Sequence, residues 1–103
     1  MKEVNGEELN ALIESGKKVV CDFWASWCGP CRMLAPVMET LSGELAEQAE
    51  FVKMDIDQNP EKAIELGIAS IPTIIIFENG KVKAQNIGFM PEAAMREYLK
   101  ENL

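Results

Sequence analysis

The sequence predicts an α/β fold in which helices cover both faces of a central β-sheet. Residues 19–24 are almost all apolar, which is typical of a strand buried on both faces. Strand and helix patterns alternate along the chain, and Asn79-Gly80 between two β-rich runs is a strong hairpin signal. Because the chain has 103 residues, 48% of them hydrophobic, we expect a single domain over residues 1–103.

Hydrophobic periodicity and turn residues predict where each element begins and ends. Asn5 and Glu8 have the spacing of a helix capping box, and Asn59-Pro60 is typical of a capped helix start. Gly16 is expected to end the helix that starts at Asn5, and Gly67 the helix that starts at Asn59. The expected order is a strand near 2–4, a helix between 5 and 16, a strand at 19–24, a helix from 28 to about 46, a strand at 51–56, a short helix between 59 and 67, strands at 73–77 and 81–86, and a helix over 91–103 with Ala94, Met95, Tyr98 and Leu99 on its inner face.

Two cysteines, Cys28 and Cys31, lie where the strand at 19–24 gives way to the long helix. At this spacing they share one helix face with Cα atoms about 5–6 Å apart, the separation that a disulfide needs. A helix N-terminus lowers the pKa of a thiol, so Cys28, the first and less covered of the two, is expected to be the attacking thiolate. Cys31, one turn deeper, is expected to stay protonated until a neighbouring base removes its proton, which makes it the resolving thiol. Gly29 and Pro30 between them predict a short, stiff loop.

Residues 20–31, Val-Cys-Asp-Phe-Trp-Ala-Ser-Trp-Cys-Gly-Pro-Cys, resemble the active-site segment of the thioredoxin family. The resemblance continues through Ile71-Pro72-Thr73 and Gly88, so it spans nearly the whole chain. It implies a three-layer fold with a central mixed sheet of four or five strands and about four flanking helices. It also implies a cis peptide bond before Pro72 that faces the two cysteines. The implied activity is the reduction of protein disulfides through a reversible dithiol/disulfide pair, Cys28–Cys31.

Asp22 is a carboxylate in the middle of the apolar strand, where burial should raise its pKa unless it is paired. Our interpretation is a buried base that accepts the proton of Cys31, as the thioredoxin counterpart of Asp22 is thought to do. The alternative is a wet strand end with a salt bridge between Asp22 and Lys53. Lys53 corresponds in the resemblance to a lysine near that acid, where it would tune the site, and its own alternative is a solvated surface cation.

Trp27, Ile71, Pro72, Gly88 and Phe89 are candidates for a substrate-binding surface around the nucleophilic thiol. If the implied cis bond is present, the backbone of Ile71 is free to pair with an extended substrate segment, a short form of strand addition. An apolar rim of this kind binds many partners, because backbone pairing carries little side-chain information. The alternative for Trp27 and Phe89 is ordinary core packing.

Other functions of the cysteine pair are less well supported by the composition. A zinc site needs four ligands, whereas the chain has no histidine and only one further cysteine, Cys21, which we expect to fill the core on the opposite side of the sheet from Asp22. Gly29-Pro30 carries no charge that would stabilise the thiolate, so the pair is expected to give electrons rather than take them. An oxidant or isomerase of similar fold, and a binding module with incidental thiols, remain alternatives.

Charge and motif content set expectations about partners and compartment. The net charge of -7, from 17 acidic and 10 basic residues, disfavours nucleic acid and anionic membrane surfaces as partners. The sequence has no secretory leader pattern and no run of 18 apolar residues, so we expect a cytoplasmic protein. We also expect a monomer. No nucleotide-binding glycine pattern or metal set indicates a bound cofactor or metal. The resemblance implies electrons from NADPH through a flavin-containing thioredoxin reductase, and diverse disulfide-containing client proteins.

Overall fold

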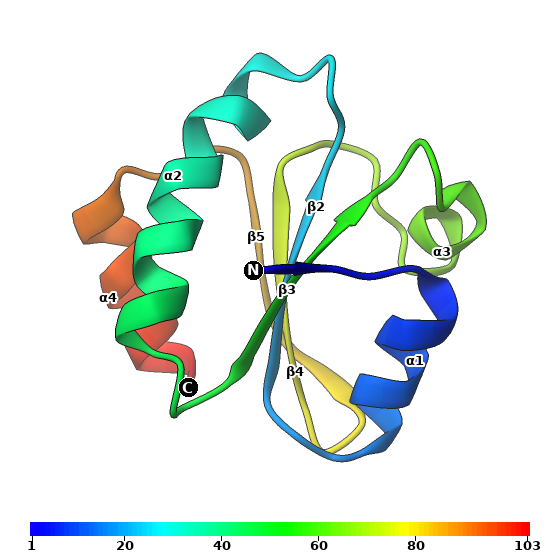
Figure 1. Ribbon diagram of the computed structural model, residues 1–103, viewed down its shortest axis with the longest axis horizontal. Helices are drawn as coiled ribbons and strands as arrows, with labels where there is room; N and C mark the ends of the chain where they lie inside the picture. Colours follow the sequence, from blue (N-terminus) through cyan, green and yellow to red (C-terminus); the bar gives the residue numbers. More distant parts are fainter.

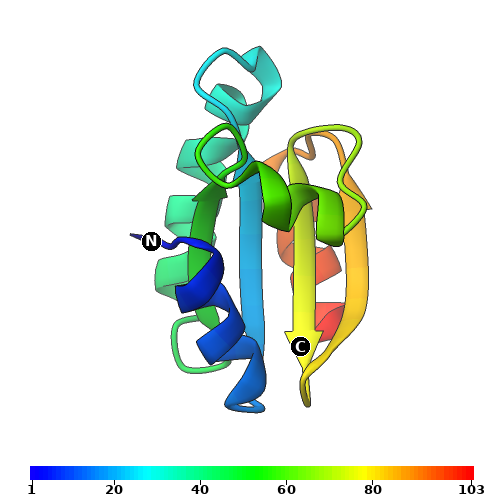
Figure 2. The same cartoon turned by 90° about the vertical axis from the view of Figure 1, so that its right-hand side faces the viewer.

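A five-stranded sheet lies between two pairs of helices in the computed structural model, which describes residues 1–103 (Figure 1). Helices α2 and α4 cover one face of the sheet, and α1 and α3 cover the other (Figure 2). The predicted α/β class and the three-layer arrangement are confirmed. The elements are β1 (Lys2–Glu3), α1 (Gly6–Glu14), β2 (Val19–Trp24), α2 (Gly29–Glu44), β3 (Glu50–Asp55), α3 (Pro60–Glu65), β4 (Thr73–Glu78), β5 (Lys81–Ile87) and α4 (Glu92–Asn102).

The sheet is mixed and has the strand order β1-β3-β2-β4-β5. Strand β3 pairs in parallel with both β1 and β2, whereas β4 pairs antiparallel with β2 and β5. The central strand β2 is therefore paired along both edges and covered on both faces. This position explains why its sequence is a nearly continuous apolar run rather than an alternating one.

Each face of the sheet has its own hydrophobic core, and alternate residues of β2 contribute to each. The core on the side of α2 and α4 contains Val20, Leu34, Met38, Leu41, Leu45, Phe51, Ile74, Ile76, Met95 and Leu99. The core on the side of α1 and α3 contains Val4, Leu9, Val19, Cys21, Phe23, Val52, Met54, Ile75 and Phe77. Cys21 and Asp22 thus face opposite sides of the sheet, as predicted, and only Asp22 faces the side of α2.

Two local predictions are confirmed in detail. The Asn5 side chain accepts a hydrogen bond from the backbone N–H of Glu8 at 2.8 Å, and the Glu8 carboxylate accepts one from the N–H of Asn5 at 3.0 Å, so the capping box of α1 is complete. Between β4 and β5, Asn79 and Gly80 both have positive φ, +55° and +80°, which the tight hairpin turn requires.

Two other local predictions are wrong, and several element ends differ by one or two residues, where helices and strands fray. Asn59 occupies the N-cap of α3 but makes no side-chain cap; its Oδ1 accepts from the N–H of Gly6 at 3.2 Å, and its Nδ2 donates to the carbonyl of Asp55 at 3.0 Å. The side chain therefore ties α3 to α1. Ala94 is exposed rather than on the inner face of α4, where Met95 and Leu99 are buried.

None of the four helices has the length and apolar character that crossing a membrane would require.

We expect Asn5→Ala to lower the free energy of unfolding by about 1 kcal/mol, because it removes the acceptor that caps α1. Asn5→Ser, which keeps a side-chain oxygen at the cap, should retain most of that stability. Urea denaturation of the oxidised protein measures both differences. An equal loss in the two variants would show that the capping hydrogen bond is not what stabilises this end of the chain.

Candidate active site

The two thiols lie at the junction of β2 and α2, and they form a disulfide with Cα atoms 5.2 Å apart. Cys28 is the N-cap residue of α2, with extended backbone angles, and its Sγ accepts a hydrogen bond from the N–H of Cys31 at 3.2 Å. A sulfur atom thus takes the place of the oxygen that usually caps a helix. The N-terminus of α2 stabilises negative charge at this position, so it favours a thiolate at Cys28 after reduction. Pro30 lies in the first turn, where a residue needs no N–H.

The predicted difference in exposure between the two cysteines is not seen. Cys28 is 4% exposed and Cys31 is 3% exposed, because the disulfide holds both sulfurs against Ala25 in one small buried cluster. Their surroundings differ instead. Cys28 Sγ lies 3.8 Å from the carbonyl oxygen of Ile71, whereas Cys31 lines a cavity that Asp22 also lines. The first sulfur therefore borders the candidate client surface and the second borders the buried carboxylate.

Ile71 and Pro72 are joined by a cis peptide bond, as the resemblance implies. The N–H and C=O groups of Ile71 make no backbone hydrogen bond within the protein, while the Pro72 carbonyl accepts from the N–H of Gly88 at 2.8 Å. Gly88 has a φ of +98°, a conformation that glycine adopts without strain. Ile71 thus lies beside Cys28 with its polar backbone available for an extended chain, and Gly88 is hydrogen-bonded to the next residue, Pro72.

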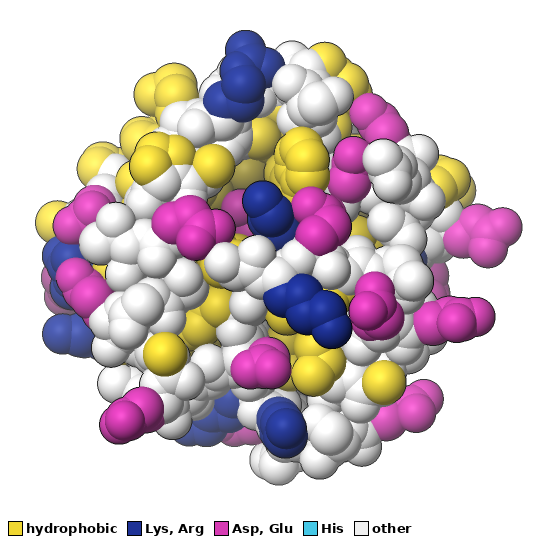
Figure 3. All heavy atoms as spheres, viewed as in Figure 1, with side chains coloured by type: hydrophobic (Ala, Val, Ile, Leu, Met, Phe, Trp, Pro, Cys, Tyr) yellow, Lys and Arg dark blue, Asp and Glu magenta, His cyan; other side chains and the backbone are white.

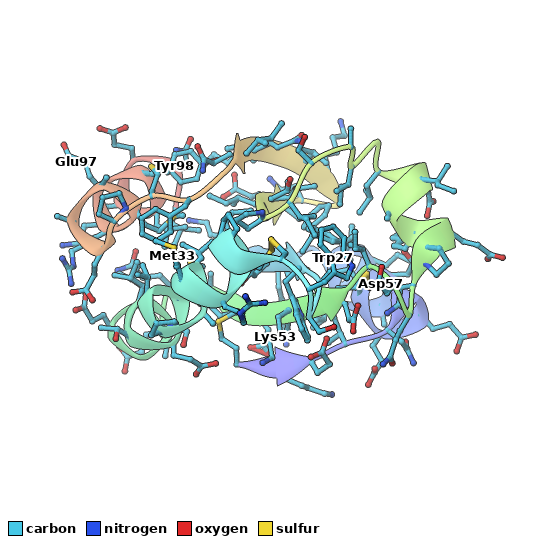
Figure 4. All side chains as sticks on the ribbon, turned by 90° about the horizontal axis from the view of Figure 1, so that it is seen from above. Trp27, Met33, Lys53, Asp57, Glu97 and Tyr98 are labelled. Carbon is cyan, nitrogen blue, oxygen red and sulfur yellow. A yellow bond between two sulfur atoms is a disulfide. The ribbon has the colours of Figure 1, made fainter.

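Trp27 and Phe89 lie on the surface, with exposed fractions of 66% and 38%, so the core-packing alternative is wrong for both. The indole Nε1 of Trp27 donates to Asp57 Oδ2 at 2.8 Å, and Figure 4 shows the two side chains together at this end of the molecule. The backbone N–H of Asp57 in turn donates to Asp55 Oδ1 at 2.9 Å. Asp57 therefore holds the indole N–H of the exposed ring. Sequence reasoning missed this pair, since no local pattern relates residues that are 30 positions apart.

Asp22 is buried, with an exposed fraction of 4%, so it does not lie at a wet strand end. It lines a cavity of about 120 Å³ together with Cys31 and Lys53. Burial raises the pKa of Asp22 from its ordinary 3.8 to about 7; the nearby Lys53 charge opposes this rise and that of Glu3 adds to it. No ion pair joins Asp22 and Lys53 within 4.0 Å, and Asp22 Oδ1 has no hydrogen-bond partner in the protein.

Lys53 lies on β3 opposite Asp22 in the parallel register, and its side chain is half-buried. Its ammonium group lies 5.5 Å from the centroid of the Trp24 ring, a cation–π contact. With no direct ion pair to Asp22, the Lys53 charge lowers the pKa of that carboxyl from a distance.

Arg32 is a further residue of the site that sequence reasoning missed. It follows Cys31 directly on α2, lines the Asp22 cavity and donates from Nη1 to the carbonyl of Ser26 at 2.9 Å. This hydrogen bond ties the loop before Cys28 to the first turn of α2. The i, i+6 separation between Arg32 and Ser26 crosses the strand–helix junction, so neither strand nor helix periodicity points to it.

Cys21 takes no part in this arrangement. It is fully buried on the side of the sheet away from the disulfide, and burial raises the pKa of its thiol well above the ordinary value. It therefore cannot join Cys28 and Cys31 as a third zinc ligand. The structure has no group of three or more histidine, cysteine, aspartate or glutamate side chains placed to hold a metal ion.

A disulfide at a helix start, bordered by an unpaired backbone segment and a buried carboxylate, is typical of a thiol–disulfide oxidoreductase. Residues 1–101 match the sequence model of the Thioredoxin family. The chain is 43% identical over 101 residues to the thioredoxin of Staphylococcus epidermidis, an alignment that covers 98% of this chain and 96% of that protein. It is 40% identical over 94 residues to the thioredoxin of Rickettsia typhi, covering 91% and 90% of the two chains. The chain therefore belongs to the thioredoxin family, and it is a protein-disulfide reductase.

We expect Asp22→Asn to stabilise the oxidised protein at pH 8 by as much as about 4 kcal/mol. The pKa of Asp22 is higher in the folded than in the unfolded chain, so the folded state holds the proton more tightly and stability falls as pH rises from about 4 to about 7. The amide removes that dependence, and the gain should shrink towards pH 4. Urea denaturation at several pH values measures it, with the exposed Glu47→Gln as a charge-matched control. A gain that is independent of pH would contradict the prediction.

Proposed function

We propose that this chain reduces disulfides of diverse client proteins in the cytoplasm, with Cys28 as nucleophile, Cys31 as resolving thiol and Asp22 as proton acceptor. The observation that carries the proposal is the position of the disulfide: Cys28 caps α2 beside the unpaired backbone of Ile71, and Cys31 faces the cavity of Asp22. All these groups come from one chain over residues 1–103, so we infer that a single domain, as a monomer, completes the site.

The first step is attack on the client. The Cys28 thiolate, stabilised by the Cys31 N–H and the start of α2, attacks one sulfur of the client disulfide. A Cys28–client disulfide forms, the client's own disulfide breaks, and the second client sulfur leaves as a thiolate. An extended client segment would pair with the N–H and C=O of Ile71 beside Pro72, while Trp27, Gly88 and Phe89 supply the surface around it.

The second step returns the protein to its disulfide. Asp22, ionised above a pH of about 7, takes the proton of the Cys31 thiol, and the new thiolate attacks Cys28 Sγ. The Cys28–Cys31 disulfide forms, the mixed disulfide breaks, and the reduced client leaves. Lys53 tunes this step, because its charge favours the ionised form of Asp22.

The oxidised protein must then receive two electrons. We infer that a flavin-containing thioredoxin reductase supplies them from NADPH, since family membership supports such a partner. No cofactor of its own is proposed, and the acidic surface, with its net charge of -7, gives no support for nucleic acid or membrane binding.

Cys31→Ser should accumulate covalent complexes with client proteins, because attack still occurs but resolution does not. Non-reducing gels and mass spectrometry of the purified variant would detect mixed disulfides through Cys28. The double variant Cys28→Ser, Cys31→Ser keeps Cys21 and should capture nothing. Mixed disulfides through Cys21, or none in the single variant, would contradict the assigned roles.

The direction of electron flow is tested by the equilibrium of the Cys28–Cys31 disulfide in a series of glutathione buffers. Fluorescence of Trp24 and Trp27, which lie beside the pair, reports the oxidised fraction. We expect the disulfide to persist until the buffer is strongly reducing, with a midpoint well below the potential of glutathione. A midpoint near or above that potential would indicate an oxidant or isomerase and would overturn the proposed direction.

A further inference from the structure

Charged side chains on three neighbouring strands lie in one line across the sheet. Glu3 of β1 is in register with Lys53 of β3, and Lys53 is in register with Asp22 of β2. Side chains in register on neighbouring strands share a face, and Val4, which follows Glu3, belongs to the core on the side of α1. Glu3 therefore faces the side of α2, as Asp22 does. Because adjacent strands lie about 4.8 Å apart, the two acidic residues are about 10 Å apart at the backbone, with Lys53 between them.

The outer member of this line, Glu3, is exposed but held in place. Its Oε2 accepts a hydrogen bond from the backbone N–H of Asp55 at 3.1 Å, so the carboxylate is tied to β3 rather than free to turn into solvent. The next residue, Val4, donates its N–H to the carbonyl of Lys53 at 2.8 Å, which holds the backbone of this short strand. A negative charge is thus fixed at the edge of the sheet.

Lys53 makes a salt bridge with neither of its acidic neighbours, since no carboxylate oxygen lies within 4.0 Å of its ammonium. The ammonium lies instead over the Trp24 ring, 5.5 Å from its centroid. Lys53 and Glu3 therefore both act on Asp22 through space, and with opposite signs: the positive charge favours the ionised carboxylate and the negative charge disfavours it. Because Asp22 is buried, solvent screens these interactions less than it would between exposed groups.

We propose that Glu3 is a positioning residue for Asp22: its carboxylate, fixed at the edge of the sheet, offsets the Lys53 charge and keeps the buried carboxyl protonated to a higher pH. The consequence for resolution rests on the proposed function, in which Asp22 is the base; the electrostatic effect itself does not. A general base works best when it titrates near the working pH. Glu3 thus counteracts a lysine that by itself would make Asp22 a weaker base.

Other charged groups also border Asp22 or its cavity, and they must stay constant in a test of Glu3. On the β4 side, the partner of Asp22 in the sheet is Ile74, which carries no charge. Figure 3 shows the face of the molecule over which β1 runs in Figure 1, where acidic and basic side chains lie next to one another. The groups are Lys53 of β3, Cys31, Arg32 and Glu39 of α2, and the Met1 ammonium that bonds Glu39.

Glu3→Gln is the informative variant, because the amide removes the charge but keeps an oxygen that accepts from the Asp55 N–H. We expect the pKa of Asp22 to fall from about 7 by roughly half a unit. The ionised fraction of Asp22 at pH 6 then rises about twofold to threefold. Resolution of the mixed disulfide should be faster by the same factor at that pH and almost unchanged at about pH 9, where Asp22 is ionised in both proteins.

The pKa is measured from the ¹³C shift of the Asp22 carboxyl in the oxidised protein, where the cysteines of the disulfide do not titrate. The control is Glu7→Gln, which removes an exposed carboxylate from the same end of the chain, but on α1 and therefore on the other side of the sheet. We expect a shift of the Asp22 pKa in Glu3→Gln and none in Glu7→Gln. Equal pKa values in wild type and Glu3→Gln would overturn the proposal.

The dependence on salt separates an effect of charge from an effect of structure. Glu3 is exposed, so the difference in Asp22 pKa between wild type and Glu3→Gln should shrink in 0.5 M NaCl, where the Debye length is only about 4 Å. A difference of the same size at low and high salt would show that glutamine acts by changing the structure, and the proposal would be wrong.

Asp22→Asn separates this inference from the proposed function. If Glu3→Gln lowers the pKa of Asp22 but Asp22→Asn does not slow resolution, the role of Glu3 stands and the assignment of the base fails. If Asp22→Asn slows resolution and Glu3→Gln leaves the pKa of Asp22 unchanged, the assignment of the base stands and the role of Glu3 fails.

Discussion

The hydrogen bond from the Cys31 N–H to Cys28 Sγ is the interaction on which the site depends. It makes a cysteine the cap of α2, so the sulfur proposed to attack the client is also the atom that caps the helix. Only four residues separate the end of β2 at Trp24 from the first helical residue, Gly29. The central, fully paired strand therefore holds this cap in place. The geometry of the disulfide is fixed by the buried sheet from which the short loop starts.

The same strand places a second ionisable group beneath the first, and the two environments act in opposite directions. The start of α2 favours negative charge on Cys28, whereas burial disfavours it on Asp22 and raises the pKa of that carboxyl to about 7. Environments that separate two groups in this way assign them different roles in acid–base chemistry. The period of two in β2 completes the division, because it sends Cys21 into the opposite core and leaves Asp22 and Trp24 facing α2.

Local patterns predicted the elements well, since a capping box or an Asn79-Gly80 turn depends only on neighbouring residues. The prediction failed at Asn59, where a distant N–H, that of Gly6, competes for the side chain. Local patterns also did not predict the hydrogen bond between Trp27 and Asp57, because its two residues are distant in the sequence. The cis bond before Pro72 came from the resemblance alone. The sequence could have placed Trp24 beside Asp22, because residues two positions apart on a strand share a face. A tryptophan at such a position is ordinary core packing until its N–H is found unpaired.

The arrangement separates recognition from proton handling. In the proposed mechanism, a client meets the backbone of Ile71 and exposed rings such as Trp27, groups that contact almost any extended chain and demand no particular sequence. The proposed proton acceptor, Asp22, lies on the interior side of the disulfide, where the client does not reach. The client therefore has to supply only an accessible disulfide. Because every group proposed to move a proton belongs to the protein itself, the proposed resolving step would serve clients whose sequences have nothing else in common.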